Sequence, residues 1–279
     1  MRFAICNETF QNWTWEDTCR FVASTGYEGI EVAPFTLAED VRTLGARRRA
    51  ELRAVAEGAG LTIVGLHWLL VSPKGLSLTS EDRAVRAATS QYLQSLVDFC
   101  ADLGGHVMVL GSPAQRRIPQ GGTAEDAAER FCDAIRPAMD LALQRGIRIC
   151  IEPLPPPEAD FILTLEEAHG ILARLNHPAA YTILDVKSAS AENEPIPSLI
   201  RKFAGSIAHV HANDANRRGP GFGDTDFVPI LAALREVGYS GFVSVEVFDY
   251  SPDPQTIART ALAYLHAAED DPQSSCTKL

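Results

Sequence analysis

Four residues of the kinds that bind metals or transfer protons stand at the ends of four short apolar runs in the second half of the chain. Glu152 lies in ICIEP, Asp185 in TILDV, His211 in HVHAND and Glu246 in VSVEVF. Side chains of these types act as metal ligands, general acids or general bases. If the four runs are successive strands of one parallel barrel, their C-terminal ends converge and bring the four side chains together.

Three carboxylates and an imidazole in one place need a compensating charge. Left bare, the carboxylates would repel one another, and burial would disfavour their charged forms. A divalent cation removes this conflict, because it binds charged oxygens and accepts a neutral imidazole. An oxygen-rich ligand set suits Mn²⁺, Mg²⁺ or Co²⁺ better than a structural zinc site, with Zn²⁺ as a further alternative. The sequence therefore predicts one divalent metal ion, bound by Glu152, Asp185, His211 and Glu246.

The rest of the chain supplies the elements that would position these residues. Short β-branched runs alternate with longer segments rich in Ala, Leu, Arg and Glu, and such short apolar runs are typical of strands buried on both faces. Eight strand–helix units in 279 residues predict a (β/α)8 TIM barrel, a fold that typically needs about 250 residues. The predicted strands are Phe3–Cys6, Gly29–Val32, Thr62–His67, Val107–Leu110, Arg148–Glu152, Tyr181–Asp185, Ile207–His211 and Phe242–Val247.

Helix boundaries are marked by glycine and by small polar residues. Helices are predicted over Glu39–Ala59, Glu81–Leu103, Ala124–Gln144 and Phe227–Val237. Expected C-terminal caps are Gly26, Gly60, Gly104, Gly146 and Gly238, and expected N-caps are Thr14, Ser80, Thr123 and Thr164. No break in composition divides the chain, so we expect a single catalytic domain over residues 1–268 and a polar tail over 269–279.

The ligand positions, together with HANDANRRGPGFGDTDF after strand seven and SVEVF on strand eight, resemble the xylose-isomerase-like TIM barrels. More narrowly, they resemble the sugar phosphate isomerase/epimerase group that includes the D-tagatose and D-psicose 3-epimerases. The resemblance implies a metal, usually Mn²⁺, that stabilises an enediolate formed from a ketose. It also implies that Glu152 and Glu246 remove and return the proton. We therefore expect a metal-dependent sugar isomerase or epimerase.

The same resemblance implies substrate contacts for Glu158 and Arg217, which lie in the long loops after strands five and seven. His67 ends strand three and could donate a hydrogen bond to the substrate. Aromatic residues just beyond strand ends could wall a sugar pocket; the main ones are Trp15, Trp68 and Phe248, with Trp13 and Phe35 nearby.

One position departs from the family pattern. The ketose epimerases have a histidine three residues after the strand-six aspartate, whereas this chain reads DVKS and has Ser188 there. Lys187, the residue before it, could bind a carboxylate or phosphate, or lie in solvent. The departure leaves the substrate and the reaction open. No clear phosphate-binding glycine motif follows strands seven and eight, so a free sugar or polyol is mildly preferred.

Composition and charge exclude several classes of protein. The formal net charge is −11, which disfavours nucleic acid as a partner. No stretch approaches the roughly 18 apolar residues of a membrane span, and MRFAICNETF does not fit the pattern of a signal peptide. The six cysteines lack metal-site or disulfide spacing and are expected to be buried thiols. We expect a cytoplasmic enzyme, and the resemblance suggests a homodimer or homotetramer.

Four alternatives stay open beside the epimerase. A dehydratase acting on a cyclic polyol, such as an inosose dehydratase, would use the same metal and expel water. A hydroxypyruvate-isomerase-like enzyme would depend more on the two glutamates than on the metal. An apurinic endonuclease needs additional histidines for three zinc ions, and Ser188 occupies one of those positions. A sugar-binding barrel without activity should have lost at least one of the four ligands, and all are present.

Overall fold

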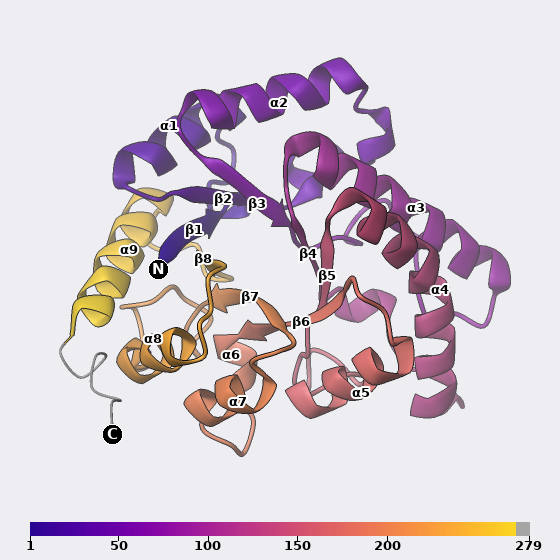
Figure 1. Cartoon of the computed structure of the whole chain (residues 1–279). Helices are drawn as coiled ribbons and strands as arrows, with labels where there is room; N and C mark the ends of the chain where they lie inside the picture. Colours follow the sequence, from indigo (N-terminus) through magenta and orange to yellow (C-terminus); the bar gives the residue numbers. More distant parts are fainter. Residues whose placement is uncertain (272–279) are drawn as a thin grey trace.

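Eight parallel strands form a closed barrel in the computed structural model, which describes residues 1–271 (Figure 1). Each strand pairs with the next along the chain, and β8 pairs with β1. This confirms the predicted TIM barrel, with one strand for every predicted run. The strands are β1 (Arg2–Cys6), β2 (Gly29–Val32), β3 (Thr62–Leu66), β4 (Val107–Leu110), β5 (Arg148–Ile151), β6 (Ala180–Asp185), β7 (Ile207–Ala212) and β8 (Phe242–Val245).

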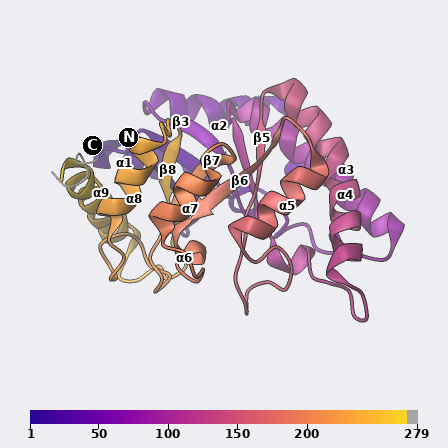
Figure 2. The same cartoon turned by 60° about the horizontal axis from the view of Figure 1, so that its bottom comes forward.

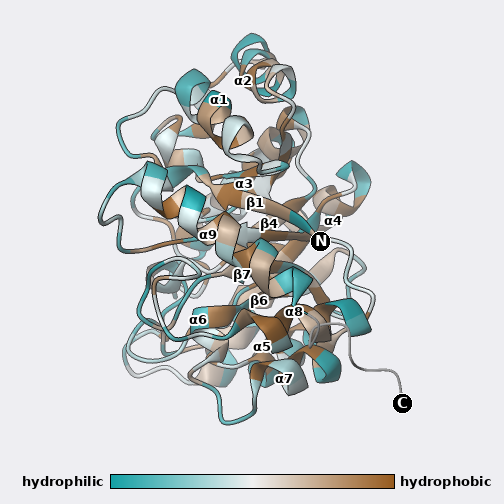
Figure 3. Ribbon diagram, turned by 90° about the vertical axis from the view of Figure 1, so that its left-hand side faces the viewer, coloured by the Kyte–Doolittle hydropathy of each residue, from teal (hydrophilic) through white to brown (hydrophobic). Residues whose placement is uncertain are grey.

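Helices surround the strands on the outside of the barrel in both views of the cartoon (Figures 1 and 2). Their apolar sides face the strands and their polar sides face outward (Figure 3). No helix within residues 1–271 is long and apolar enough to cross a membrane. The helices are α1 (Trp15–Thr25), α2 (Ala46–Gly58), α3 (Arg83–Leu103), α4 (Ala124–Arg145), α5 (Leu165–Leu175), α6 (Val186–Ala189), α7 (Ile196–Phe203), α8 (Phe227–Glu236) and α9 (Pro254–Asp270).

Most predicted helix ends agree with the structure. Thr14, Thr123 and Thr164 cap α1, α4 and α5 as predicted, and Gly26, Gly104 and Gly146 are left-handed C-terminal caps. Gly60 and Gly238 also have positive φ, one residue beyond the caps Ala59 and Val237.

Two predicted helix starts are wrong. Asp82, rather than Ser80, caps α3, because its carboxylate accepts the Ala84 N–H. The helix predicted from Glu39 begins only at Ala46, because the Asp40 side chain instead caps a separate 3₁₀ turn over Val41–Thr43.

The predicted polar tail over residues 269–279 lies mostly outside the described residues, although α9 extends into its first two residues, to Asp270. Five cysteines are buried free thiols, as expected, and Cys276 lies outside the described range.

The interior of the barrel changes from apolar to polar along its axis. Towards the N-terminal ends of the strands it holds an apolar cluster of Ala4, Val64 and Phe242. Towards the C-terminal ends it holds buried charged and imidazole side chains, among them Glu31 and His209. Alternate residues of a strand face the interior, so the polar half is built by a few residues on different strands.

Close approach of β3 and β4 depends on Gly65. A Cβ atom at this position would lie 1.9 Å from the Val107 carbonyl oxygen, which is main chain and cannot rotate away. We expect Gly65→Ala to lower the free energy of unfolding by at least about 1–3 kcal/mol, because the strands must separate.

Gly170 provides a matched control for this substitution. It lies inside α5, and a Cβ atom added there would meet no other atom within 4 Å. Gly170→Ala should therefore raise stability by about 0.5–1 kcal/mol. Urea unfolding of both variants tests the pair, and a Gly65→Ala protein as stable as wild type would contradict the role given to Gly65.

Candidate metal centre

The four predicted ligand residues meet at the C-terminal mouth of the barrel. One potential ligand atom from each of Glu152, Asp185, His211 and Glu246 lies within 4.8 Å of the others, and all four residues are buried. His211 Nδ1 lies 3.2 Å from a Glu246 oxygen, 3.9 Å from Glu152 and 4.0 Å from Asp185. Glu152 and Glu246 directly follow β5 and β8. Asp185 is the last residue of β6, and His211 lies within β7.

The orientation of His211 fits a metal ligand. Its Nε2 faces both oxygens of Glu31 at 3.3 Å. Its Nδ1 points to the three carboxylates, is buried and makes no hydrogen bond within the described residues. An imidazole that donates one N–H to a carboxylate presents the lone pair of its other nitrogen to a cation. The donor set and the unpaired Nδ1 therefore fit a divalent metal ion.

Electrostatics of the bare group show the conflict that a cation would resolve. Burial, and then the charges of Glu246 and Asp185, raise the pKa of Glu152 to about 8. Burial also acts to raise the pKa of Glu246, but the neighbouring His211 and His67 together hold it below its usual value. The two glutamates thus differ in proton affinity, with the proton on Glu152.

Glu31 contacts the candidate ligand His211 from inside the barrel. It was not identified from the sequence. It is fully buried in β2, at an irregularity in the pairing of β2 with β3. Its carboxylate accepts a 2.8 Å hydrogen bond from His209 Nε2 as well as facing His211. The sequence holds a signal for this cluster, because a glutamate interrupts the apolar run GIEV, and HVH places both imidazoles on one face of a strand.

His67 has a different role from the predicted one. It is fully buried, with Nε2 2.9 Å from Glu8 and Nδ1 3.2 Å from Glu246. Burial opposes its charge, but the charge of Glu8 and the hydrogen bonds to Glu246 and Glu8 raise its pKa to about 10. Both ring nitrogens are engaged by protein, so His67 orients Glu246 instead of contacting a substrate.

Asn213 and Trp68 also bind candidate ligands directly. Asn213 Nδ2 donates to Asp185 at 2.6 Å, and its Oδ1 accepts the backbone N–H of Lys187 at 2.8 Å. Trp68 Nε1 donates to Glu246 at 3.0 Å, from a residue with φ of 52°. A bulky residue in this left-handed region is strained, and such strain is often found at functional sites.

Glu152 depends on the absence of a side chain at Gly111, the residue after β4. A Cβ atom there would lie 2.0 Å from a Glu152 carboxylate oxygen. The carboxylate therefore rests directly against the main chain of the neighbouring strand end, which limits its positions.

A cavity of about 350 Å³ opens above the centre. Its wall includes the carboxylates of Glu152 and Glu246, together with Trp68, Phe248, Glu158 and Arg217. Phe248 stacks on Trp68 with ring centres 6.1 Å apart. Four of the predicted substrate residues thus line one cavity with two of the candidate metal ligands, Glu152 and Glu246.

Two other predicted substrate residues do not line this cavity themselves. Trp15 is buried in the first turn of α1, where its Nε1 donates to the Leu52 carbonyl, so it packs between α1 and α2 and does not line this cavity. Lys187 does not lie in solvent, because its side chain is buried and forms an ion pair with Glu158.

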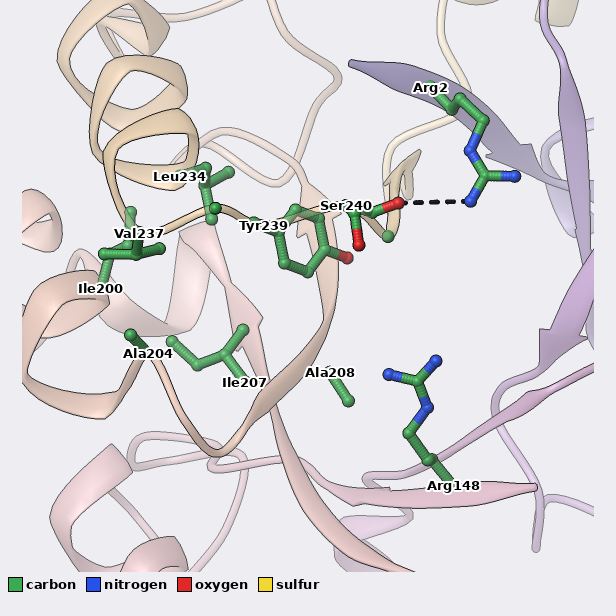
Figure 4. Close-up of a pocket in the computed structure, with 12 residues that line it drawn as sticks. Arg2, Arg148, Ile200, Ala204, Ile207, Ala208, Leu234, Val237, Tyr239 and Ser240 are labelled. Carbon is green, nitrogen blue, oxygen red and sulfur yellow. Dashed lines mark hydrogen bonds between the residues drawn. The ribbon is translucent and has the colours of Figure 1, made fainter. Parts of the chain in front are cut away.

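A second cavity, of about 270 Å³, has the wrong composition for this chemistry (Figure 4). It lies beside the N-terminal ends of β1, β5 and β7, and its described lining consists of apolar residues with Arg2, Arg148, Tyr239 and Ser240. It offers no carboxylate or imidazole among these lining residues.

Comparison with known proteins agrees with the barrel fold. The sequence profile of the xylose isomerase-like TIM barrels matches residues 19–268. The chain belongs to this family. It is 26% identical over 242 residues to the D-psicose 3-epimerase of Ruminiclostridium cellulolyticum, covering 84% of this chain and 80% of that protein. It is 27% identical over 233 residues to the L-ribulose 3-epimerase of Mesorhizobium japonicum, covering 82% and 75%.

Solved structures show the same fold. A crystal structure of a D-psicose 3-epimerase obtained in the presence of D-fructose superimposes with a TM-score of 0.85 at 24% identity. The superposition covers 96% of this chain and 99% of that one.

We predict that Glu31 sets the metal affinity through His211. Glu31→Gln removes the charge that orients the imidazole and should weaken Mn²⁺ binding about 10- to 100-fold, as is typical for partners of metal-bound histidines. Isothermal titration with Mn²⁺ measures the effect, and Glu28→Gln, on an exposed residue just before β2, is the control. Equal Mn²⁺ affinity in Glu31→Gln and wild type would remove Glu31 from this role.

Proposed function

We propose that this protein is a divalent-metal-dependent sugar epimerase of the ketose 3-epimerase type, an isomerase that moves a proton at a carbon next to a ketose carbonyl. The main support is the convergence of Glu152, Asp185, His211 and Glu246 on one buried cluster, two members of which, Glu152 and Glu246, line a cavity. The similarity to psicose and ribulose 3-epimerases over most of the chain points to the same chemistry.

The four ligands would hold one ion, for which we favour Mn²⁺ because most of the donors are carboxylate oxygens. When bound, such an ion polarises the substrate carbonyl and stabilises the negative charge of an enediolate. The remaining work falls to the protein: to orient the substrate, to exclude water and to move the proton.

Glu152 and Glu246 are the proposed acid–base pair. They follow β5 and β8, which are three strands apart in the barrel, and both reach the cavity. The pKa of Glu152 is raised and that of Glu246 is lowered. A pair of carboxyl groups whose environments separate their pKa values can act as acid and base in the same step. Trp68 and His67 fix one oxygen of Glu246, which keeps its carboxylate in one orientation.

The proposed substrate is a neutral sugar or polyol held between Trp68, Phe248, Glu158 and Arg217. Aromatic faces suit the C–H faces of a sugar, and charged groups suit its hydroxyls. Arg217 has a φ of 70° and its guanidinium lies 5.4 Å from the Phe248 ring centre. Its backbone carbonyl accepts the N–H groups of Phe248 and Asp249, which ties the β7 and β8 loops together.

The proposed roles predict separate effects of two substitutions. Glu246→Gln should lower solvent-deuterium exchange into a ketose by at least about 100-fold, because a general base is lost, and should also weaken metal binding. His211→Ala should release most of the metal. Exchange followed by NMR and metal analysis of the purified proteins measure these effects.

His169→Ala, on the exposed side of α5, is the control for both variants. Wild-type exchange in Glu246→Gln would refute the acid–base assignment, and an unchanged metal content in His211→Ala would remove His211 from the ligand set.

The raised pKa of Glu152 predicts a proton-linked metal affinity. Below about pH 8 Glu152 holds a proton in the metal-free protein, and a metal ligand must be deprotonated. Binding of Mn²⁺ at pH 7 should therefore release at least one proton, and the apparent affinity should rise with pH across the range in which Glu152 titrates. Calorimetry in two buffers of different ionisation enthalpy measures the released protons, and a release of zero would contradict this assignment.

A further inference from the structure

A partly buried ion pair joins the loop that follows β5 to α6, the short helix that follows β6. Both carboxylate oxygens of Glu158 accept hydrogen bonds from Lys187 Nζ, at 2.9 and 3.0 Å. The Lys187 side chain is only 6% exposed, whereas that of Glu158 is 32% exposed. The backbone N–H of Lys187 is fixed by Asn213, which also binds the candidate ligand Asp185. The position of the ammonium group is thus tied to the metal centre.

The pair still has hydrogen-bonding capacity for a ligand. An ammonium group has three N–H donors and a carboxylate about four acceptor sites, and the two bonds between Lys187 and Glu158 occupy only part of each set. Nζ also lies 4.6 Å from the Phe248 ring centre. Glu158 and Phe248 both line the cavity, so the free acceptor sites of Glu158 stand at its wall. The Lys187 ammonium group contacts both of these wall residues.

Ser188 does not provide the polar contact at this wall. Its hydroxyl is buried and has no hydrogen-bond partner within the described residues. Lys187 is one residue closer to Asp185, and its longer side chain reaches Glu158. Of these two residues, Lys187 is therefore the one whose side chain reaches a residue of the cavity wall.

The charge of the pair indicates what it binds. Lys187 and Glu158 neutralise each other, so together they exert little attraction on a phosphate. A donor beside an acceptor instead matches a hydroxyl group, which both donates and accepts. A buried ion pair is also weak evidence for a purely stabilising role, because removal from water offsets most of the attraction.

We propose that Lys187 and Glu158 form one substrate-binding unit that holds neighbouring hydroxyl groups of a neutral sugar and determines which sugar is accepted. This inference rests on the proposed epimerase function only for the identity of the ligand. The contact itself can be tested by binding alone.

The test is a double-mutant cycle of Lys187→Met, Glu158→Gln and the double variant, each loaded with Mn²⁺. Dissociation constants for free ketoses, D-fructose among them, and for polyols without a carbonyl are measured by calorimetry, and KM and kcat by deuterium exchange. We expect each single variant to bind sugars about 10- to 100-fold more weakly, as for a lost charged hydrogen bond. The double variant should bind no more weakly than the poorer single variant, because the two residues act as one unit.

Controls separate this inference from the proposed function. Lys202→Met removes a surface lysine paired with Glu166 and Glu194 and should change nothing. Glu158→Gln, at a partly exposed position, keeps the test valid if Lys187→Met fails to fold. Sugar affinities equal to wild type in the single variants would overturn the inference, and so would losses that add in the double variant. Tighter binding of phosphorylated than of free ketoses would also overturn it. Pair-dependent binding without exchange would instead refute the epimerase and leave the inference standing.

Discussion

The structure is organised around carboxylates held together in a space that water scarcely reaches. Glu8, Glu31, Glu152, Asp185 and Glu246 are all buried at the C-terminal end of the barrel interior or beside it. Like charges at such distances cannot all be ionised without partners. The imidazoles of His67, His209 and His211, and a site that fits a divalent cation, are the partners that the chain provides.

This constraint explains why the candidate ligands need particular residues around them as hydrogen-bond partners. Glu31 engages His211 from inside the barrel, Glu8 engages His67, and Asn213 engages Asp185. Two of these contacts restrain a candidate ligand directly, and the contact of Glu8 does so through His67, which binds Glu246. The strand ends bring the candidate ligands to the same place, and the buried contacts determine the orientation of their side chains. A centre that binds a metal and moves a proton needs both the position and the orientation.

Much of the architecture can be predicted from the sequence, because eight short apolar runs with helical segments between them have few other solutions. The proximity of the four candidate ligands is also predictable, since their runs end on adjacent strands. The supporting residues are harder to find: Glu8 and His209 act through side-chain direction across the barrel, which sequence spacing does not give. Trp15 is predicted at the cavity because it follows a strand, yet its indole turns towards Leu52 and the helices. The position of Lys187 stays open in the sequence, because only the fold brings it to Glu158.

Gly111 has a consequence for interpreting related sequences. The carboxylate of Glu152 occupies the volume that any larger residue at this position would need. A relative that retains all four ligand residues but has acquired a side chain here could not hold Glu152 in the same place. Position 111 can therefore serve as a marker when genomes are surveyed, separating copies of this barrel able to assemble the centre from copies that have drifted to other uses.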